Sequence, residues 1–390
     1  MKQGWEYKKL GEVCTIERGG SPRPITDYIT DSEDGINWIK IGDAQEGSKY
    51  ITSTKEKIRP EGIKKSRFVH KGDFILSNSM SFGRPYILKV DGCIHDGWLV
   101  IHDDNEVFIK DYLYYILSSS IMYAKFSQLA VGGVVNNLNS SLVRKIAIPI
   151  PPKSTQLSIV SELDNINELI RLKKEQLKDY DNLAQSIFYE MFGDPVENEK
   201  GWEVKKLGEV CTIERGSSPR PITAYITDSK DGINWIKIGD AQEGSKYITS
   251  TKEKIKPEGL KKSRFVHKGD FIISNSMSFG KPYILKIDGC IHDGWLVIHD
   301  NNNVFIKIYL YYLLASSIMY AKFSKLAVGG VVNNLNSSLV RKVDVSIPPL
   351  PLQHLFAQRI EQIEHQKSEV TKAITDLETL LASRMQHWFE

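Results

Sequence analysis

Short apolar runs separated by polar residues recur along the first part of the chain. Runs such as GINWIKIGD (35–43), GDFILSNS (72–79) and GWLVIHD (97–103) are rich in β-branched and aromatic residues and are punctuated by Gly and Asp. This pattern is typical of short β-strands. The segment VFIKDYLYYILSSSIMYAKF (107–126) instead indicates one or two helices, with Asp104 or Asn105 as the N-cap. Together these features predict an α+β domain.

A different period begins after the proline-rich segment IPIPP (148–152). Residues 157–191 contain neither Pro nor Gly, and their apolar positions alternate in steps of three and four, which is a heptad pattern. A second segment repeats the pattern 197 residues later, and Lys173, Lys367 and Arg384 are the polar interruptions. The predicted seam residues are Leu163, Ile166, Ile170, Leu177, Tyr180, Ala184 and Ile187, and then Ile360, Ile363, Val370, Ile374, Leu377 and Leu381.

The chain contains one sequence unit twice. GWEYKKLGEVCTIERG begins at Gly4 and GWEVKKLGEVCTIERG at Gly201, and residues 4–145 differ from residues 201–342 at 15 of 142 positions. Beyond Lys145 the identity disappears, although the heptad register persists. The predicted organisation is a first domain, a long helix, a second domain and a second long helix, over residues 1–152, 153–196, 197–349 and 350–390.

The two heptad segments restrict how the long helices can pack. A helix of about 40 residues is roughly 60 Å long, so the first helix carries the chain well away from the first domain. If the second helix folds back along the first, both apolar seams are buried in an antiparallel coiled coil with pseudo-two-fold symmetry. The alternative is that each helix packs its seam on its own domain.

Composition and charge narrow the function classes. The net charge is only +3, so any nucleic-acid-binding surface must be local. The four cysteines form no CxxC pair, and Cys93 with His95 supplies two potential ligands where a zinc site needs four, so we expect a structural role for both. No membrane helix or secretory signal is expected, which indicates the cytoplasm. The sequence Asn-Pro-Pro, which would indicate an amino-methyltransferase, and a Walker lysine, which would indicate an ATPase, do not occur.

The motifs and their order resemble those of the specificity subunits of type I restriction–modification systems. The resemblance lies in the domain opening GWEYKKLGEVCTIERGGSPRP (4–24), the junction GGVVNNLNSSLVRKIAIPIPPKSTQLSIVSELD (132–164) and the second junction SIPPLPLQHLFAQRIEQIE (346–364). It covers essentially the whole chain and implies two target-recognition domains separated by a central and a distal helix. One departure is that members of this family usually carry two dissimilar recognition domains, whereas these are near copies.

The resemblance implies a DNA-recognition subunit that is not itself an enzyme. Its expected partners are double-stranded DNA, two modification subunits that use S-adenosylmethionine, and restriction subunits that use ATP and Mg²⁺, while this chain holds no cofactor or metal. Because the domains are near copies related by a two-fold axis, the expected target is bipartite and palindromic, with an unread gap. The alternative is the specificity subunit of a stand-alone modification methyltransferase or of a type IIB-like system.

Polar loops that follow strands supply the candidate DNA contacts, because they can reach bases or phosphates without burying a core. The alternatives are solvated surface turns and, for the Asn pair, a cap of the following helix. At the position of Arg84 the second domain has Lys281, which keeps the charge and indicates a phosphate contact. The first-domain candidates are Arg18, Ser21, Arg23, Lys40, Asn78, Ser79, Ser81, Arg84, Asn136 and Asn137. Their second-domain equivalents are Arg215, Ser218, Arg220, Lys237, Asn275, Ser276, Ser278, Lys281, Asn333 and Asn334.

The second domain is more basic than the first. Six substitutions add seven units of positive charge, which predicts tighter non-specific DNA binding unless the changes are neutral surface drift. They are Asp27→Ala224, Glu33→Lys230, Asp104→Asn301, Glu106→Asn303, Asp111→Ile308 and Gln128→Lys325.

Overall fold

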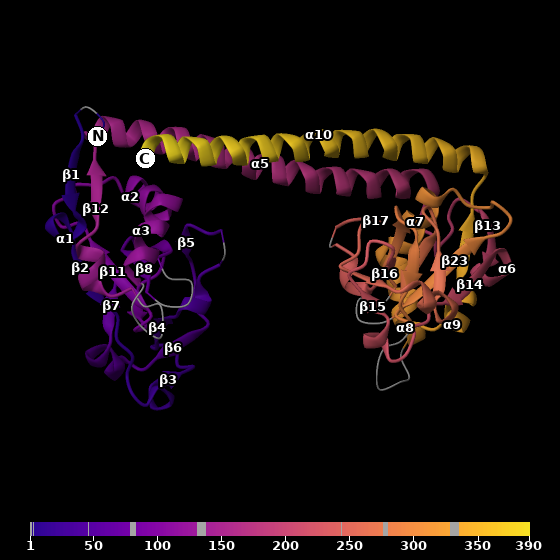
Figure 1. The fold of residues 1–390 in the computed structure, drawn as a ribbon, viewed down its shortest axis with the longest axis horizontal. Helices are drawn as coiled ribbons and strands as arrows, with labels where there is room; N and C mark the ends of the chain where they lie inside the picture. The colour runs from indigo at the N-terminus through magenta and orange to yellow at the C-terminus, as the bar shows by residue number, and fades with distance from the viewer. Residues whose placement is uncertain are drawn as a thin grey trace. The chain divides into compact units, whose positions relative to one another are not determined.

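A computed structural model describes residues 2, 4–45, 47–78, 83–130, 138–242, 244–275, 280–327 and 335–390. The chain divides into two compact units, which we call unit 1 (residues 1–174 and 372–390) and unit 2 (residues 175–371). The long helices α5 (Lys153–Phe192) and α10 (Leu350–Phe389) have 40 residues each. The division falls within these helices, so each unit contains one half of α5 and one half of α10 (Figure 1).

The described part of unit 1 contains two five-stranded sheets, ordered β2-β11-β8-β9-β5 and β3-β6-β4-β10-β7, and the antiparallel pair β1-β12. Its shorter helices are α1 (Leu10–Val13), α2 (Lys110–Ser118), α3 (Ser120–Ala130) and α4 (Ser140–Arg144). Its strands are β1 (Glu6–Lys9), β2 (Thr15–Arg18), β3 (Ile29–Thr30), β4 (Ile36–Ile39), β5 (Tyr50–Ile51), β6 (Glu56–Ile58), β7 (Arg67–Val69), β8 (Phe74–Ser77), β9 (Pro85–Leu88), β10 (Gly92–Ile94), β11 (Trp98–His102) and β12 (Ala147–Ile150).

Unit 2 repeats this topology, with sheets β14-β23-β20-β21-β17 and β15-β18-β16-β22-β19 and the pair β13-β24 among its described residues. Its shorter helices are α6 (Leu207–Val210), α7 (Lys307–Ala315), α8 (Ser317–Ala327) and α9 (Ser337–Arg341). Its strands are β13 (Glu203–Lys206), β14 (Cys211–Arg215), β15 (Ile226–Thr227), β16 (Ile233–Ile236), β17 (Tyr247–Ile248), β18 (Glu253–Ile255), β19 (Arg264–Val266), β20 (Phe271–Ser274), β21 (Pro282–Leu285), β22 (Gly289–Ile291), β23 (Trp295–Asp300) and β24 (Asp344–Ile347).

The sheet that contains β8 and β11 is buried on both faces. Successive residues of a strand point to opposite faces, and in β8 Phe74 and Leu76 join a core with helix α2, whereas Ile75 joins the core shared with the other sheet. In β11, Leu99 joins the core with helix α2, and Trp98 joins the core shared with the other sheet. This explains why both strands are continuous apolar runs and do not alternate with polar residues.

A buried glutamine joins each domain to the start of its own long helix. The Gln156 side chain is 1% exposed, accepts a hydrogen bond from the Ile109 backbone N–H at 2.7 Å and donates to the carbonyls of Val107 and Pro151. Gln353 makes the equivalent three bonds in unit 2. Because these bonds satisfy backbone groups at the entry to α2 and α7, the start of each long helix is part of its domain and not an exposed linker.

The long helices pair antiparallel, as contacts in each unit show. In unit 1, the Trp388 indole of α10 donates to Glu162 near the start of α5 at 2.9 Å, and Arg384 pairs with the same carboxylate. In unit 2, Lys367 in the first half of α10 pairs with Asp181 in the second half of α5 at 2.6 Å. The expected α+β domains and antiparallel helix pairing are therefore confirmed.

The helix seam is shared between the opposite helix and the domain core. All predicted seam residues are buried or half-buried. Leu163 of α5 lies in the core of unit 1, and Ala184 of α5 and Ile360 of α10 lie in the core of unit 2. The two packing modes that the heptads left open, on the other helix or on the domain, thus occur together. Four further aromatic residues that were not predicted for this interface are buried there: Phe188, Phe192, Phe356 and Phe389.

Candidate nucleic-acid interface

A polar turn connects the two sheets of unit 1 between β10 and β11. His95 and Asp96 form this turn, and the Gly97 backbone N–H donates to His95 Nδ1 at 2.9 Å. The Nδ1 atom is therefore an acceptor, which places the proton of the neutral ring on Nε2, 3.0 Å from Asp96 Oδ1. Unit 2 has the same arrangement at His292 and Asp293, with the corresponding distance at 2.9 Å.

The basic loop after β2 converges on this turn. The Ser21 hydroxyl donates to Asp96 Oδ1 at 2.8 Å, Arg18 Nε donates to the Asp96 carbonyl at 2.9 Å, and Arg23 Nη2 lies 3.5 Å from Asp96 Oδ2. The loop after β2 lies closest to the turn at Gly19, where a Cβ atom would lie 2.3 Å from the His95 carbonyl oxygen. A side chain at Gly19 would therefore push the loop away from the turn.

We call the group in unit 1 the Asp96 cluster: Arg18, Ser21, Arg23, Asn78, His95 and Asp96. The equivalent Asp293 cluster in unit 2 contains Arg215, Ser218, Arg220, Asn275, His292 and Asp293. The Asp293 cluster repeats the contacts of Asp293 with Ser218 at 2.8 Å, with Arg220 at 3.4 Å and with Arg215 through the carbonyl at 2.8 Å. The same cluster is thus present in both units.

The environment keeps the central carboxylate charged and the imidazole neutral. Partial burial acts to raise the pKa of Asp96, but the hydrogen bond from Ser21 and the nearby His95, Arg18 and Arg23 outweigh it and lower this pKa. The pKa of His95 is lowered, mainly by burial. Asp96 acts to raise this pKa, whereas the positive charges of Lys40, Arg18 and Arg23 lower it further. The pKa values of Asp293 and His292 shift in the same directions.

A cavity of about 960 Å³ opens beside the Asp293 cluster. Its polar lining includes Arg220, Lys237 and Glu253, and its apolar lining includes Ile222 and Trp235. Lys237, one of the candidate DNA contacts, follows β16 and forms an ion pair with Glu253 at 2.5 Å. Lys40 pairs with Glu56 in unit 1. The cavity therefore contains both cationic donors and carboxylate acceptors, and groups of both kinds contact phosphates or base edges in protein–DNA interfaces.

Asn78 and Asn275 are organising residues in this conformation. Both are 1% exposed, and each side-chain amide donates to the carbonyl of the central aspartate at 2.9 Å. The Asn78 carbonyl also accepts a hydrogen bond from the Leu138 backbone N–H at 2.9 Å. Direct contact of these two side chains with DNA was the expectation, and their burial favours a role in holding the turn instead.

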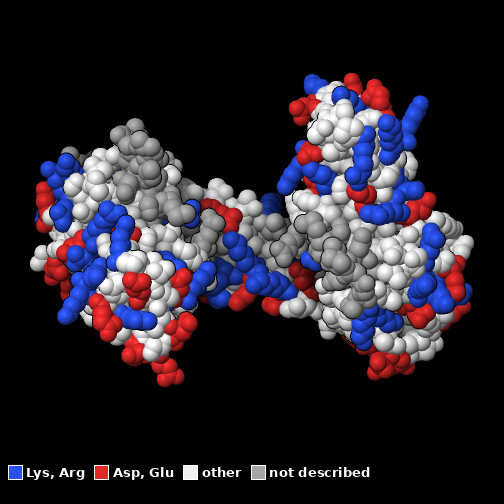
Figure 2. All heavy atoms as spheres, turned by 90° about the horizontal axis from the view of Figure 1, so that it is seen from below, with Lys and Arg blue, Asp and Glu red and all other residues white. Residues whose placement is uncertain are grey.

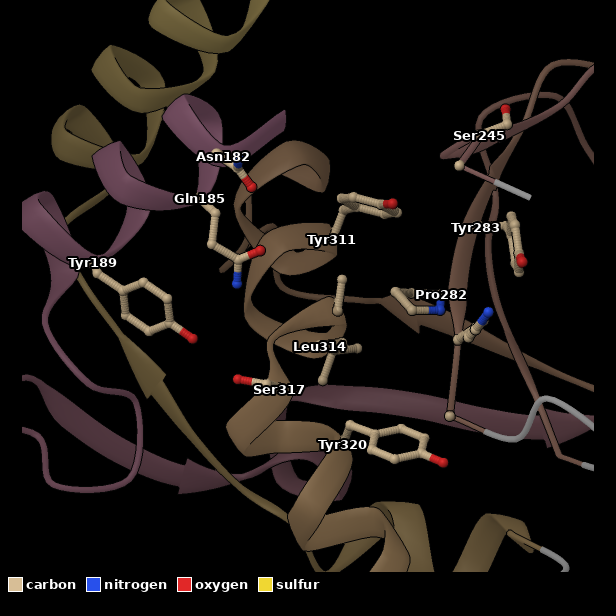
Figure 3. Close-up of a pocket in the computed structure, with 14 residues that line it drawn as sticks. Asn182, Gln185, Tyr189, Ser245, Pro282, Tyr283, Tyr311, Leu314, Ser317 and Tyr320 are labelled. Carbon is tan, nitrogen blue, oxygen red and sulfur yellow. The ribbon is translucent and has the colours of Figure 1, made fainter. Parts of the chain in front are cut away.

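Arg84 and Lys281 line a second type of cavity. Lys281 lines a cavity of about 790 Å³ in unit 2, to which α7 and α8 contribute Tyr311 and Tyr320 and α5 contributes Tyr189 (Figure 3). Arg84 lines the equivalent cavity of about 500 Å³ in unit 1. In unit 2 this cavity is distinct from the one that Ser218 and Arg220 line.

Eight candidate residues lie outside the described residues, and their assignment remains a prediction. The nearby Asn139 side chain accepts a hydrogen bond from the Leu142 backbone N–H and caps α4. The eight are Ser79, Ser81, Asn136, Asn137, Ser276, Ser278, Asn333 and Asn334.

The aspartate at the centre of each cluster was not among the predicted site residues, and His95 was considered only as a metal ligand. The dipeptide His95-Asp96 nevertheless lies between two apolar strands, and this pattern indicates a polar turn. Among the residues that the structure describes, no group of three His, Cys, Asp or Glu side chains could hold a metal ion. No helix in the described part is both long and apolar enough to cross a bilayer.

On the face drawn in Figure 2, Lys and Arg side chains lie among Asp and Glu side chains in each unit. This distribution agrees with the net charge of +3. Recognition of a polyanion by such a surface must depend on where individual cations are placed.

Comparison with known proteins gives one consistent result. The family model described as type I restriction modification DNA specificity domain matches residues 2–179 and 199–379. The putative type I restriction enzyme MjaX specificity subunit of Methanocaldococcus jannaschii is 24% identical, with 98% of this chain and 93% of the relative covered. The MjaIX specificity subunit of the same organism is 26% identical, but the match covers only 63% of this chain and 60% of the relative.

Bacterial relatives and solved structures agree. The EcoBI specificity subunit of Escherichia coli is 20% identical over 96% of this chain and 82% of its own length. A chain from a study of complex assembly and conformational transition of the type I R-M system matches with a TM-score of 0.68 and 20% identity, covering 99% of this chain and 97% of that chain. The S subunit from M. genitalium matches with a TM-score of 0.50 and 14% identity, covering 100% and 98%. At these identities the structural matches bear on the fold.

Proposed function

The chain belongs to the type I restriction modification DNA specificity family, and we propose that its Asp96 and Asp293 clusters are the surfaces with which it reads DNA. The observation that carries the proposal is the convergence of the loop after β2 on a single charged aspartate, with the same partners and nearly the same distances in both units. The arginines at the rim are suited to bidentate contacts with guanine or phosphate.

The target is a bipartite inverted repeat with an unread gap. The Asp96 and Asp293 clusters are identical in residue type, which supports two half-sites with the same short motif. The long helices pair antiparallel within each unit, and each domain begins its own helix, as an internal two-fold relation requires. Two recognition domains related by a two-fold axis read their half-sites on opposite strands, so the target is an inverted repeat.

The chain acts in the cytoplasm as a non-catalytic subunit. Two modification subunits bring S-adenosylmethionine and methylate adenine, restriction subunits bring ATP- and Mg²⁺-dependent cleavage, and this chain supplies the target sequence and a scaffold for both. Its family membership supports this assignment, as does the assembly of the type I system named for its structural relative.

Long-read methylation sequencing of a host that expresses this chain with its modification subunits tests the proposal. The expected result is one palindromic bipartite motif, and alanine at Arg18 and Arg215 should reduce methylation at every site. Two unrelated half-sites or a direct repeat would contradict the inverted arrangement. Methyl transfer by the purified chain alone would contradict the non-catalytic role.

A further inference from the structure

We propose that Asp96 and Asp293 are specificity-determining residues that each select a cytosine in their half-site. In this inference, which rests on the proposed function, the Oδ2 atom of the carboxylate accepts a hydrogen bond from the N4 amino group of cytosine in the major groove.

The two oxygens of each carboxylate have different surroundings. Asp96 Oδ1 accepts a hydrogen bond from Ser21 at 2.8 Å and lies 3.0 Å from His95 Nε2, so it is the more closely surrounded of the two oxygens. The Oδ2 atom contacts Arg23 at 3.5 Å, which is long for a charge-assisted hydrogen bond. In unit 2 the corresponding distance from Asp293 Oδ2 to Arg220 is 3.4 Å. The Oδ2 atom therefore has acceptor capacity for a ligand.

This oxygen can be reached from outside. The Asp96 side chain is 27% exposed, and Asp293 lines the cavity of about 960 Å³. The partner Arg23 is 82% exposed, as is Arg220, so either guanidinium can turn toward DNA without losing a buried contact. A carboxylate beside the cluster arginines weakens the attraction of this surface to phosphate. A hydrogen bond from a base donor to the carboxylate would explain why an aspartate is present at this position.

The chemistry of the major groove narrows the ligand to one base. An ionised carboxylate only accepts hydrogen bonds. Guanine and thymine present acceptors, and adenine presents its amino group beside the N7 acceptor, whereas cytosine presents a donor alone. The neighbouring Arg23 matches the O6 and N7 acceptors of the guanine in the same base pair. The geometry therefore fits a G·C pair with its cytosine on the carboxylate.

Asp96→Asn and Asp293→Asn, made singly and together, test the inference in the complete chain with its modification subunits. Asparagine keeps an acceptor for Ser21 and His95 but replaces the second oxygen by a donor, which no longer suits cytosine. The Asp96→Asn variant should relax one cytosine position in one half-site, with discrimination reduced about tenfold. The other half-site, read by Asp293, is the internal control. Methylation sequencing gives the readout.

Asp91→Asn and Asp288→Asn are the matched controls. Each substitution removes one negative charge, as Asp96→Asn does. The Asp91 and Asp288 carboxylates are 62% and 61% exposed, and each accepts a hydrogen bond from a backbone N–H outside the clusters. The two substitutions should leave the motif unchanged. If Asp96→Asn lowers the melting temperature, Ser21→Ala, which removes one contact of Oδ1 without a charge change, should weaken discrimination at the same base.

A motif without cytosine, or unchanged preference in both half-sites of the double variant, overturns the inference. If the arginine variants still weaken methylation in that case, only the selection of cytosine fails. If the arginine variants have no effect either, the proposed function of the clusters fails with it.

Discussion

Units 1 and 2 neutralise an equivalent lysine, Lys49 in unit 1 and Lys246 in unit 2, with carboxylates from different elements. In unit 1, Lys49 pairs with Asp111 of α2 at 2.6 Å and lies 3.7 Å from Asp164 of α5. In unit 2, Ile308 stands where unit 1 has Asp111, and Lys246 pairs with Glu364 of α10 at 2.8 Å. The domain supplies the main counter-ion in unit 1, whereas the long helix must supply it in unit 2.

This difference shows that near-identical domains need not be interchangeable on their helices. The helix position of Glu364 is occupied by Asn167 in α5, so the loss of an acid in the second domain is matched by the gain of an acid in its helix. The change from Asp111 to Ile308 removes a negative charge from the second domain, and Glu364 therefore balances it within unit 2. Burial is the main cause that lowers the pKa of Lys246, and the contact with Glu364 opposes it.

The hydrophobic joint differs as well. Phe188 of α5 packs against Tyr309 and Phe356 in unit 2, with ring centroids 5.8 and 5.7 Å apart. The equivalent position in unit 1 is Met385 of α10, which is only half-buried. The joint between helix and domain is thus more aromatic in unit 2.

The largest expected effect comes from Phe188→Ala. Removing a fully buried ring should lower the free energy of unfolding by about 3–5 kcal/mol, and the flexible, half-buried Met385→Ala should cost about 1–2 kcal/mol. Differential scanning calorimetry of the full chain measures both. Equal losses would show that the two joints contribute alike.

A smaller effect is expected from Glu364→Gln. Lys246 is 8% exposed, so removal of its carboxylate should cost about 3 kcal/mol. Asp111→Asn should cost about 1 kcal/mol, because Lys49 is 17% exposed and retains Asp164. Urea unfolding at neutral pH compares them. The double change Lys246→Met with Glu364→Leu is the control and should recover most of the loss, whereas no recovery would mean that the ion pair is not the cause.

The smallest effect concerns the charge of the surfaces. Lys230 is exposed in the loop that follows β15, whose Ile226 lines the cavity beside Asp293, and Glu33 occupies the same position in unit 1. Lys230→Glu should weaken non-specific DNA binding and lower the slope of log K against log salt by about 1, and Glu33→Lys should do the opposite. Filter binding over a salt series measures both slopes. Unchanged slopes would identify the basic drift as neutral.

Most secondary structure could be predicted from the sequence, because it depends on local patterns. The apolar run of β11 and the heptads of α5 have different periods, and each period suits one backbone geometry. The aromatic ends of the helices, such as Phe192 and Phe389, were not assigned because they bury against a domain core as well as along the seam.

The candidate site was predictable only in part. Arg18, Ser21 and Arg23 were found because a polar, glycine-containing loop follows a strand. Asn78 was assigned to DNA contact, but its burial depends on a turn 18 residues away. The polarity of a loop indicates that it is exposed as a whole, but it does not indicate which of its side chains point inward.

The sequence by itself determined the duplication of the domain, the order of domains and long helices, and the placement of basic loops at strand ends. Only the tertiary structure decided that Asp96, 75 residues from Ser21, is the common partner of that loop, and that Lys246 depends on the long helix for its counter-ion. Local periodicity constrains backbone conformation and the face of an element that is buried. The partner of a charged side chain is decided when the sheets and helices pack, since that step brings distant residues within hydrogen-bonding distance and removes them from water.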